Sequence, residues 1–360
     1  MLRKDKVKLM DPVTGENYKY SFEPYDPIGE GSCASVFLGE NLTTGKYVAI
    51  KRMSVITEKD YKACANEIKI MTKLSGPEAA NIVQIEAAKN EDRQLSLGEF
   101  HSTYAYIAMT FGEENLGDLL DPEELLSLPL QLVIMRGILN GVVYIHAQGI
   151  IHRDLKPDNI VVNGMHQGKP IPLICDFGSS ISSDHQDYVS VGTPHFMAPE
   201  QLCGLEERTV SDEDKKLVFQ THTEKSDVYA CAAILWALST GNQAPYSDYT
   251  NTEDLIDVIC YLGQRPRITA EIDPAIAPII ERGWKQKPEE RPTAIQMHKA
   301  INSLFFETNK KKRESECELA EGKAVKIFPR RRLDLTVNTS SAGEQAEANV
   351  IFRRQARAGQ

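Results

Sequence analysis

The 360-residue sequence lacks an apolar run long enough to cross a membrane. Its longest candidate, residues 229–238, is about half of the roughly 18 residues that a membrane helix requires. The N-terminus is charged throughout and lacks the apolar core of a secretory signal, so no signal peptide is predicted. The composition, 26% charged and 41% hydrophobic, is typical of a globular protein that can hold one large domain and an appendage.

Cysteines with metal-ligand spacing are missing too. The seven cysteines are odd in number and scattered along the chain. Such cysteines indicate free thiols in a reducing compartment, which favours a cytoplasmic protein.

An overall excess of positive charge is also absent. The formal net charge is −10 at pH 7, which argues against a general nucleic-acid-binding protein. From Phe306 onward, however, twelve Lys and Arg accompany eight Asp and Glu, so this tail is basic and the rest of the chain is acidic. We expect the tail, residues 306–360, to be largely disordered. Docking on the acidic body, on an acidic lipid or on nucleic acid is the alternative.

The most informative stretch present is residues 150–159, I-I-H-R-D-L-K-P-D-N, followed later by Asp176-Phe177-Gly178. Phosphoryl transfer needs a carboxylate to orient the attacking hydroxyl, a cation near the transferred phosphate, and oxygen ligands for magnesium. Asp154, Lys156 and Asn159 supply these residue types, and Asp176 offers a second magnesium ligand. A polar turn between two apolar strands is the alternative interpretation, but it does not account for eight consecutive positions of a known signature.

This stretch resembles the catalytic loop of the eukaryotic-type Ser/Thr protein kinases, with some similarity to their tyrosine-kinase-like branch. The resemblance extends over residues 22–305 and implies an α+β protein with the bilobal kinase fold. The expected N-lobe, about residues 22–111, is a small antiparallel β-sheet with one main helix. The expected C-lobe, about residues 113–305, is larger and mainly helical. Residues 1–21 are expected to be a polar lead-in.

A glycine-rich hairpin is expected near residue 30. Gly29 and Gly31 occupy the first two glycine positions of the kinase G-x-G-x-x-G-x-V loop, while Ala34 replaces the third, which puts the loop's flexibility in doubt. The resemblance implies that ATP is contacted from this hairpin, from the following strand and from the linker between the lobes. The implied residues are Ile28, Gly29, Gly31, Ser32, Val36, Ala49, Lys51, Met109 and Phe111.

Residues 48–51 read V-A-I-K, as in the kinase motif, so Lys51 is expected to neutralise the α- and β-phosphates. Helical spacing over residues 58–74 places Glu67 where the family's lysine-pairing glutamate belongs; a solvated surface glutamate is the alternative. Helices are also predicted over residues 116–126 and 130–146, with short strands at 160–162 and 172–175.

Residues 192–200, G-T-P-H-F-M-A-P-E, match the end of the family's activation segment. The resemblance implies that Thr193 bridges Asp154 and Lys156, and that Glu200 forms a buried structural pair with Arg291. It further implies that Asp227 anchors the backbone of the catalytic loop, and residues 206–220 resemble an insertion.

Control of activity is expected at Arg153, which in similar kinases needs an anion on the activation segment. Among the Ser and Tyr residues after Gly178, the family spacing points to Tyr188 or Ser190 as the phosphorylated residue, with Ser190 favoured. The competing account is that Asp184 or Asp187 already supplies the negative charge.

The resemblance therefore implies an enzyme that transfers the γ-phosphoryl group of ATP to Ser/Thr hydroxyls of protein substrates, with Mg²⁺, or alternatively Mn²⁺. Lys156 favours Ser/Thr, because tyrosine kinases lack a lysine at this position. A dual-specificity kinase, a pseudokinase scaffold and a kinase for a small molecule or lipid are the alternatives. A pseudokinase predicts loss of a catalytic residue, and a lipid kinase predicts absence of the Ala198-Pro199-Glu200 motif; neither loss is seen.

Overall fold

The structure, a computed structural model, describes residues 4–31, 34–89, 103–183, 191–205 and 223–324, with the side chains of residues 315–324 not described. Ser32, Tyr188, Ser190 and the expected insertion at 206–220 lie outside these ranges. The chain divides into two compact units, residues 1–312 and 313–360, and the described part of the second unit is the end of the last helix.

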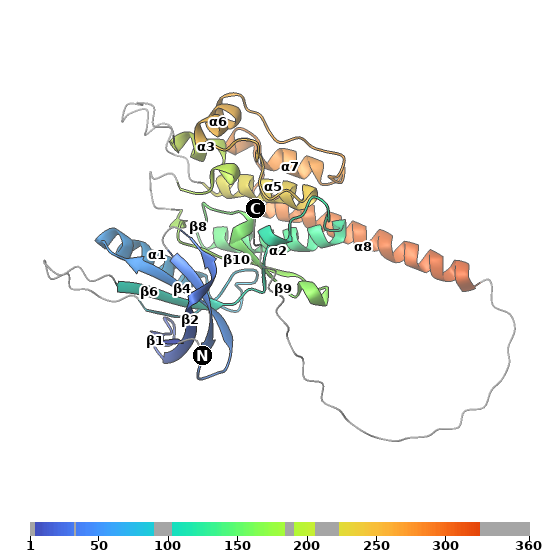
Figure 1. Cartoon of the computed structure of the whole chain (residues 1–360). Helices are drawn as coiled ribbons and strands as arrows, with labels where there is room; N and C mark the ends of the chain where they lie inside the picture. The colour runs from blue at the N-terminus through green and yellow to red at the C-terminus, as the bar shows by residue number, and fades with distance from the viewer. Residues whose placement is uncertain (1–3, 32–33, 90–102, 184–190, 206–222, 325–360) are drawn as a thin grey trace, which may run out of the picture. The chain divides into compact units, whose positions relative to one another are not determined.

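The N-terminal part of the chain is a six-stranded antiparallel sheet that closes into a barrel in the order β1-β2-β3-β4-β6-β5 (Figure 1). Val, Ile, Tyr and Phe are frequent in these strands, as expected for a pleated, half-buried surface. The strands are β1 (Asp5–Met10), β2 (Asn17–Glu30), β3 (Ala34–Asn41), β4 (Tyr47–Val55), β5 (Ile85–Lys89) and β6 (Thr103–Thr110).

The first strand corrects a prediction from the sequence, because the described part of the expected lead-in, residues 4–21, contains β1 and the start of β2. β1 pairs with β2 from Asp5 opposite Phe22 to Met10 opposite Asn17, and Met10 also pairs with Ala88 of β5. Leu9 is buried in a second apolar cluster of the sheet, where β2, β3 and β4 also contribute side chains. The alternation of polar and apolar residues in K-V-K-L was the local signal for this strand.

Helix α1 (Glu58–Leu74) has the bounds that the sequence predicts. Thr57 and Asp60 form a capping box, with the Asp60 amide donating to Thr57 Oγ1 at 3.2 Å and the Thr57 amide donating to Asp60 Oδ2 at 2.8 Å. The helix packs against β4 and β5 and buries Glu67 in the same stripe as Cys64 and Met71. An amphipathic helix capped in this way presents a carboxylate to the sheet.

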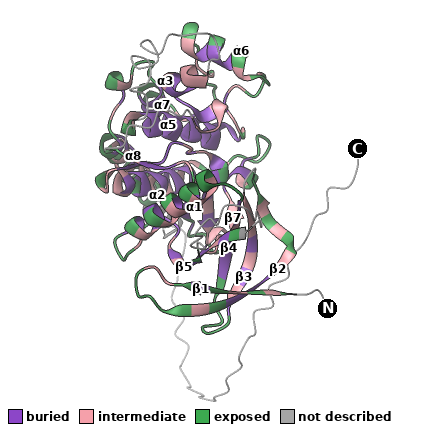
Figure 2. Ribbon diagram, turned by 90° about the vertical axis from the view of Figure 1, so that its left-hand side faces the viewer, coloured by how far each residue is buried: buried purple, intermediate pink, exposed green. Residues whose placement is uncertain are grey.

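Among the described residues after β6, helices predominate. α5 (Glu224–Thr240) lies at the centre of this part and is buried along most of its length (Figure 2), packed against α2 and α7. The other helices are α2 (Leu128–Ala147), α3 (Pro199–Leu202), α6 (Thr252–Ile256), α7 (Ala277–Gly283) and α8 (Ala294–Ala324). The short strands are β7 (Glu114–Asn115), β8 (Ile150–Ile151), β9 (Ile160–Asn163), β10 (Ile171–Ile174) and β11 (Ile181–Ser182).

Single helical turns connect these elements. The 3₁₀ turns are η1 (Gly117–Leu119), η2 (Pro157–Asn159), η3 (Met165–Gln167), η4 (Pro194–Phe196), η5 (Cys203–Leu205) and η7 (Pro288–Glu290), and η6 (Asp257–Tyr261) is π-helical. The helix predicted over residues 116–126 is therefore wrong beyond the turn η1. Pro122 disfavours helical geometry at Asp121, whose carboxylate instead accepts a hydrogen bond from the Glu123 amide at 2.8 Å.

Two other predictions need correction. α2, and not residues 229–238, is the helix that is by length and composition apolar enough to cross a membrane, with a mean hydropathy of 1.6. Half of its apolar window is buried in the structure, where α2 packs against β10 and α5, as in the core helix of a globular domain. The predicted disordered tail also starts too early, because α8 continues past Phe306 to Ala324.

Candidate active site

The antiparallel pair β9 and β10 brings the two predicted magnesium ligands to one end of a hairpin. Ile160 pairs with Ile174, and the Cys175 amide donates to the Asn159 carbonyl at 2.9 Å. Asn159 therefore ends the catalytic loop directly beside the start of Asp176-Phe177-Gly178. The pairing follows from the two short apolar runs that the sequence predicts on either side of the intervening turn.

Asp154 is held by three neighbouring side chains. Asn159 Nδ2 donates to Asp154 Oδ2 at 3.1 Å and to its carbonyl at 2.7 Å. Thr193 Oγ1 donates to Asp154 Oδ1 at 2.9 Å and accepts from Lys156 Nζ at 2.7 Å, so Thr193 bridges the two residues in the way its motif predicts. Lys156 Nζ also lies 3.5 Å from Asp154 Oδ2. A carboxylate and a cation thus face the same small volume.

Lys51 connects three elements of the chain. Its Nζ on β4 lies 2.6 Å from Glu67 Oε1 on α1 and 2.8 Å from Asp176 Oδ1 after β10. The Lys51 and Glu67 side chains are 10% and 4% exposed, whereas that of Asp176 is 46% exposed. The alternative of a solvated Glu67 is therefore excluded.

The charges of this cluster shift each other's pKa values. Burial alone would lower the pKa of Lys51, but the adjacent Glu67 and Asp176 carboxylates outweigh burial and raise it. Burial also opposes ionisation of Asp176, yet the Lys51 charge holds its pKa below the usual value. Burial raises the pKa of Glu67, which shares this one lysine with Asp176. The cluster therefore keeps Lys51 charged and Asp176 ionised.

Two residues of the site adopt backbone conformations that are uncommon for side chains other than glycine, Arg153 at φ 70° and Asp176 at φ 62°. Such strain persists when the surroundings over-determine it. Asp227, buried on α5, accepts hydrogen bonds from the amides of His152 and Arg153 at 2.9 and 3.0 Å. It therefore anchors the catalytic loop at the strained residue, as its motif implies.

Asp227 stays ionised although it is buried. Burial raises its pKa, but the 2.8 Å contact with His146 Nε2 and the amide donors outweigh burial and lower the pKa below the usual value. His146, at the end of α2, was not singled out in the sequence. No local pattern marks it, because its contact with Asp227 depends on how α2 packs against α5.

The residues expected to contact adenine share one face of the sheet. Val36 lies opposite Lys51 across β3 and β4, and Ala49 lies opposite Met109 across β4 and β6. Because side chains alternate along a strand, these four point to the same side, where Ala49 and Met109 belong to the main apolar core and the partly buried Val36 packs against it.

The hairpin and the linker flank this face. Gly29 pairs with Val36, Ile28 is 52% exposed beside it, and the Gly31 amide donates to the Ala34 carbonyl at 2.8 Å. Neither glycine has a positive φ, so the turn itself does not require them. Phe111 is half-buried at the linker, and a Cβ on the following Gly112 would lie 2.3 Å from Val161. Glycine is therefore required there by close packing.

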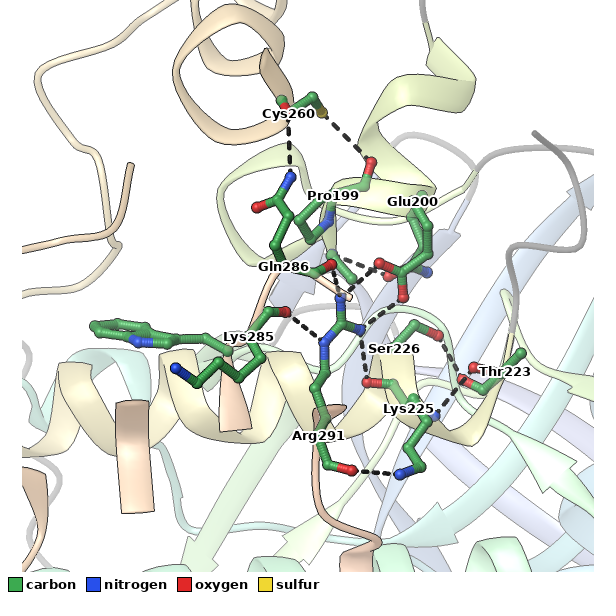
Figure 3. A network of polar contacts seen from close by, with 12 residues as sticks. Pro199, Glu200, Thr223, Lys225, Ser226, Cys260, Lys285, Gln286 and Arg291 are labelled. Carbon is green, nitrogen blue, oxygen red and sulfur yellow. Dashed lines mark hydrogen bonds and ion pairs between the residues drawn. The ribbon is translucent and has the colours of Figure 1, made fainter. Parts of the chain in front are cut away.

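Arg291 lies at the centre of a buried network of polar contacts (Figure 3). Its Nη1 and Nη2 each donate to a Glu200 oxygen at 2.7 Å, and the guanidinium also donates to the carbonyls of Lys225, Lys285 and Gln286. The Arg291 side chain is 0% exposed. The planar guanidinium group donates hydrogen bonds on all its edges. It thereby links the end of the activation segment to α5 and to the turn before α8.

We expect Glu200→Ala to lower the free energy of unfolding by about 3–5 kcal/mol, because it leaves the Arg291 charge buried without its carboxylate. Chemical denaturation of the full chain measures this change. Glu290→Ala is the matched control, since Glu290 is an exposed glutamate next to Arg291. Equal stability of both variants would contradict a structural role for the pair.

The α+β fold, the Lys51–Glu67–Asp176 cluster and the Asp154–Thr193–Lys156 bridge are the arrangement expected of a protein kinase domain. The chain belongs to the protein kinase domain family, whose sequence model matches residues 22–306.

Curated relatives agree with this assignment. A "probable serine/threonine-protein kinase" of Dictyostelium discoideum is 30% identical over 277 residues, which cover 75% of this chain and 38% of that protein. The dual specificity protein kinase shkD of the same organism is 27% identical over 288 residues, covering 78% and 34%. Serine/threonine/tyrosine-protein kinase HT1 of Arabidopsis thaliana is 27% identical over 314 residues, covering 81% and 70%. The chain thus spans about a third of the length of the two Dictyostelium relatives.

Proposed function

We propose that this chain is an active protein kinase that transfers the γ-phosphoryl group of ATP to Ser/Thr hydroxyls of protein substrates. The observation that carries the proposal is the bridge of Thr193 Oγ1 between Asp154 Oδ1 at 2.9 Å and Lys156 Nζ at 2.7 Å. Asp154 orients the attacking hydroxyl and accepts its proton, while Lys156 balances charge on the transferred phosphoryl group. We interpret residues 22–111 and 113–305 as the N-lobe and C-lobe of a bilobal kinase.

Lys51, which Glu67 orients, neutralises the α- and β-phosphates of the nucleotide. The donor set fits magnesium: Asp176 is ionised and half-exposed, with one oxygen on Lys51. Asn159 turns its amide nitrogen to Asp154, so its amide oxygen points away from that carboxylate. Hard oxygen ligands of these two kinds suit Mg²⁺, and also Mn²⁺. Asp176 and Asn159 would hold this ion, which would neutralise charge on the β- and γ-phosphates.

Dual specificity is a second candidate, because two relatives are described as dual specificity or as serine/threonine/tyrosine kinases. The test is transfer of labelled γ-phosphate by the purified full chain to three peptide pools of equal composition, with Ser, Thr or Tyr as the sole acceptor. Labelling of the Ser and Thr pools alone supports the proposal, and labelling of the Tyr pool as well supports dual specificity. If no pool is labelled and the chain does not phosphorylate itself, the result would support the alternative of a pseudokinase scaffold.

We further propose that phosphorylation of Ser190, or of Tyr188, activates the enzyme. Arg153 is 7% exposed and its Nε donates to the Ser179 carbonyl at 2.5 Å, so it already contacts the start of the activation segment. Ser180, one of the serines after Gly178, is 1% exposed and therefore inaccessible. We expect phosphatase treatment and Ser190→Ala to lower activity, whereas Ser182→Ala does not. Full activity after phosphatase treatment, and in both Ser190→Ala and Tyr188→Phe, would favour the aspartate alternative.

A further inference from the structure

Ser180, two residues after Gly178, connects three parts of the site. Its amide donates to the Phe177 carbonyl at 3.0 Å, which closes the turn that follows Asp176. Its Oγ donates to the His152 carbonyl in the catalytic loop at 3.3 Å. Its own carbonyl accepts a hydrogen bond from Asn66 Nδ2 on α1 at 3.2 Å. Ser180 is thus where α1 meets the segment that carries a predicted magnesium ligand.

Asn66 precedes Glu67 in α1, and the two side chains make different contacts. Glu67 is buried and reaches Lys51, while Asn66 is exposed and reaches Ser180. Consecutive residues on an α-helix point about 100° apart, because 3.6 residues make one turn. Two contacts in different directions fix the rotation of α1 about its axis as well as its distance from the site.

The turn itself is tightly packed against both contacts. A side chain at Gly178 would place its Cβ 3.3 Å from Asp176 Oδ1 and 3.4 Å from Glu67 Oε2. The His152 ring packs edge-on against the buried Phe177 ring, with centroids 5.1 Å apart. The direction of Asp176 and the position of the Ser180 carbonyl are therefore set by the same turn.

We propose that Asn66 is a positioning residue that couples the inward position of α1 to the orientation of Asp176. The inference rests on the proposed kinase function. In the structure, the hydrogen bond from Asn66 to Ser180 occurs together with the Lys51–Glu67 contact and with the closed turn after Asp176. Magnesium binding at Asp176 then stabilises the Lys51–Glu67 pair, and by thermodynamic linkage that pair strengthens magnesium-dependent nucleotide binding.

The expected size of this coupling is that of one neutral side chain–backbone hydrogen bond, about a 2- to 10-fold change in an equilibrium constant. We expect Asn66→Ala to reduce, by about this factor, the gain in ADP affinity that Mg²⁺ provides. Its affinity for ADP without Mg²⁺ stays unchanged. The kcat falls by a similar factor, and Asn66→Gln, which keeps the amide donor, recovers part of both losses.

The measurement is calorimetric binding of ADP to the full chain, with and without Mg²⁺, together with kcat, the KM for ATP and the melting temperature. Alanine favours helix more than asparagine does, so Asn66→Ala is not expected to melt earlier. Lys69→Ala is the matched control, as an exposed residue on the same helix with the same replacement, and it should behave as wild type.

The inference would be overturned if Mg²⁺ raised the ADP affinity of Asn66→Ala as much as it raises that of the wild type. It would also be overturned if Asn66→Ala lost ADP affinity equally with and without Mg²⁺. The binding arm requires no turnover. A wild-type chain that binds ADP with Mg²⁺ but transfers no phosphate would overturn the proposed function, while the comparison of Asn66 variants would still decide the coupling.

Discussion

We expect Asp154→Asn to slow phosphoryl transfer by about 10²–10⁴-fold while leaving the affinity for ATP nearly unchanged. Asparagine cannot take the proton of the attacking hydroxyl. In the wild type, one carboxylate oxygen of Asp154 accepts from Thr193 and the other accepts from Asn159 Nδ2. The substitution replaces one of these two acceptors by an NH₂ group, which can only donate. An amide nitrogen facing Asn159 or Lys156 would place a donor opposite a donor. The substitution therefore disturbs the position of the reacting groups and slows transfer, without removing a contact to ATP.

Single-turnover transfer and ATP binding, measured on the same preparation, separate the two effects. Asp158→Asn is the control, because it makes the same change at an exposed aspartate in the same loop. Wild-type turnover in Asp154→Asn, or an equal defect in both variants, would refute the role assigned to Asp154.

The second large effect is expected at Lys51. Lys51→Met removes the cation that lies 2.6 Å from Glu67 and 2.8 Å from Asp176, and we expect activity to fall by about 10²–10³-fold or to background. Glu67→Gln should cause a smaller loss in the same direction, because the lysine remains but is held less firmly.

The pH dependence of magnesium binding gives Lys51 an independent test. Lys51 holds the pKa of Asp176 below its usual value, so in the wild type this carboxylate is protonated only at unusually low pH. Without the cation, burial raises that pKa. Magnesium-dependent nucleotide binding in Lys51→Met is therefore lost at a higher pH as the solution is acidified.

Lys46→Met is the matched control for this experiment. Lys46 lies just before the same strand, its side chain is 62% exposed, and it pairs with Glu86 at the surface. Exposed pairs of this kind contribute about 0–1 kcal/mol, so little change is expected. Ordinary activity and an unshifted pH profile in Lys51→Met would mean that the nucleotide is bound elsewhere.

Much of the candidate site was predictable because its reactive side chains belong to short contiguous motifs. Asp154, Lys156 and Asn159 lie within one loop, and their neighbours Thr193 and Asp176 come from motifs of similar length. Helix α1 was also predictable to the residue, since a capping box and a 3.6-residue apolar period are local properties of the chain.

Contacts between elements were not predictable in this way. Nothing near Asn66 in the sequence points to Ser180, more than a hundred residues away, and nothing near His146 points to Asp227. These contacts depend on how helices pack against the turn after Asp176 and against α5. The N-terminal strand is a similar case, because Leu9 is buried only once β1 has paired with β2.

The sequence by itself determined the residue types of the site, the strands that carry them and the helix that bears Glu67, because motifs and periodicity act over a few residues. Only the tertiary structure decided that β1 closes the sheet and that Lys51 lies between two carboxylates. The physical reason is that burial, ion pairing and strand closure are interactions between distant segments, whose free energy is gained only when the chain has folded.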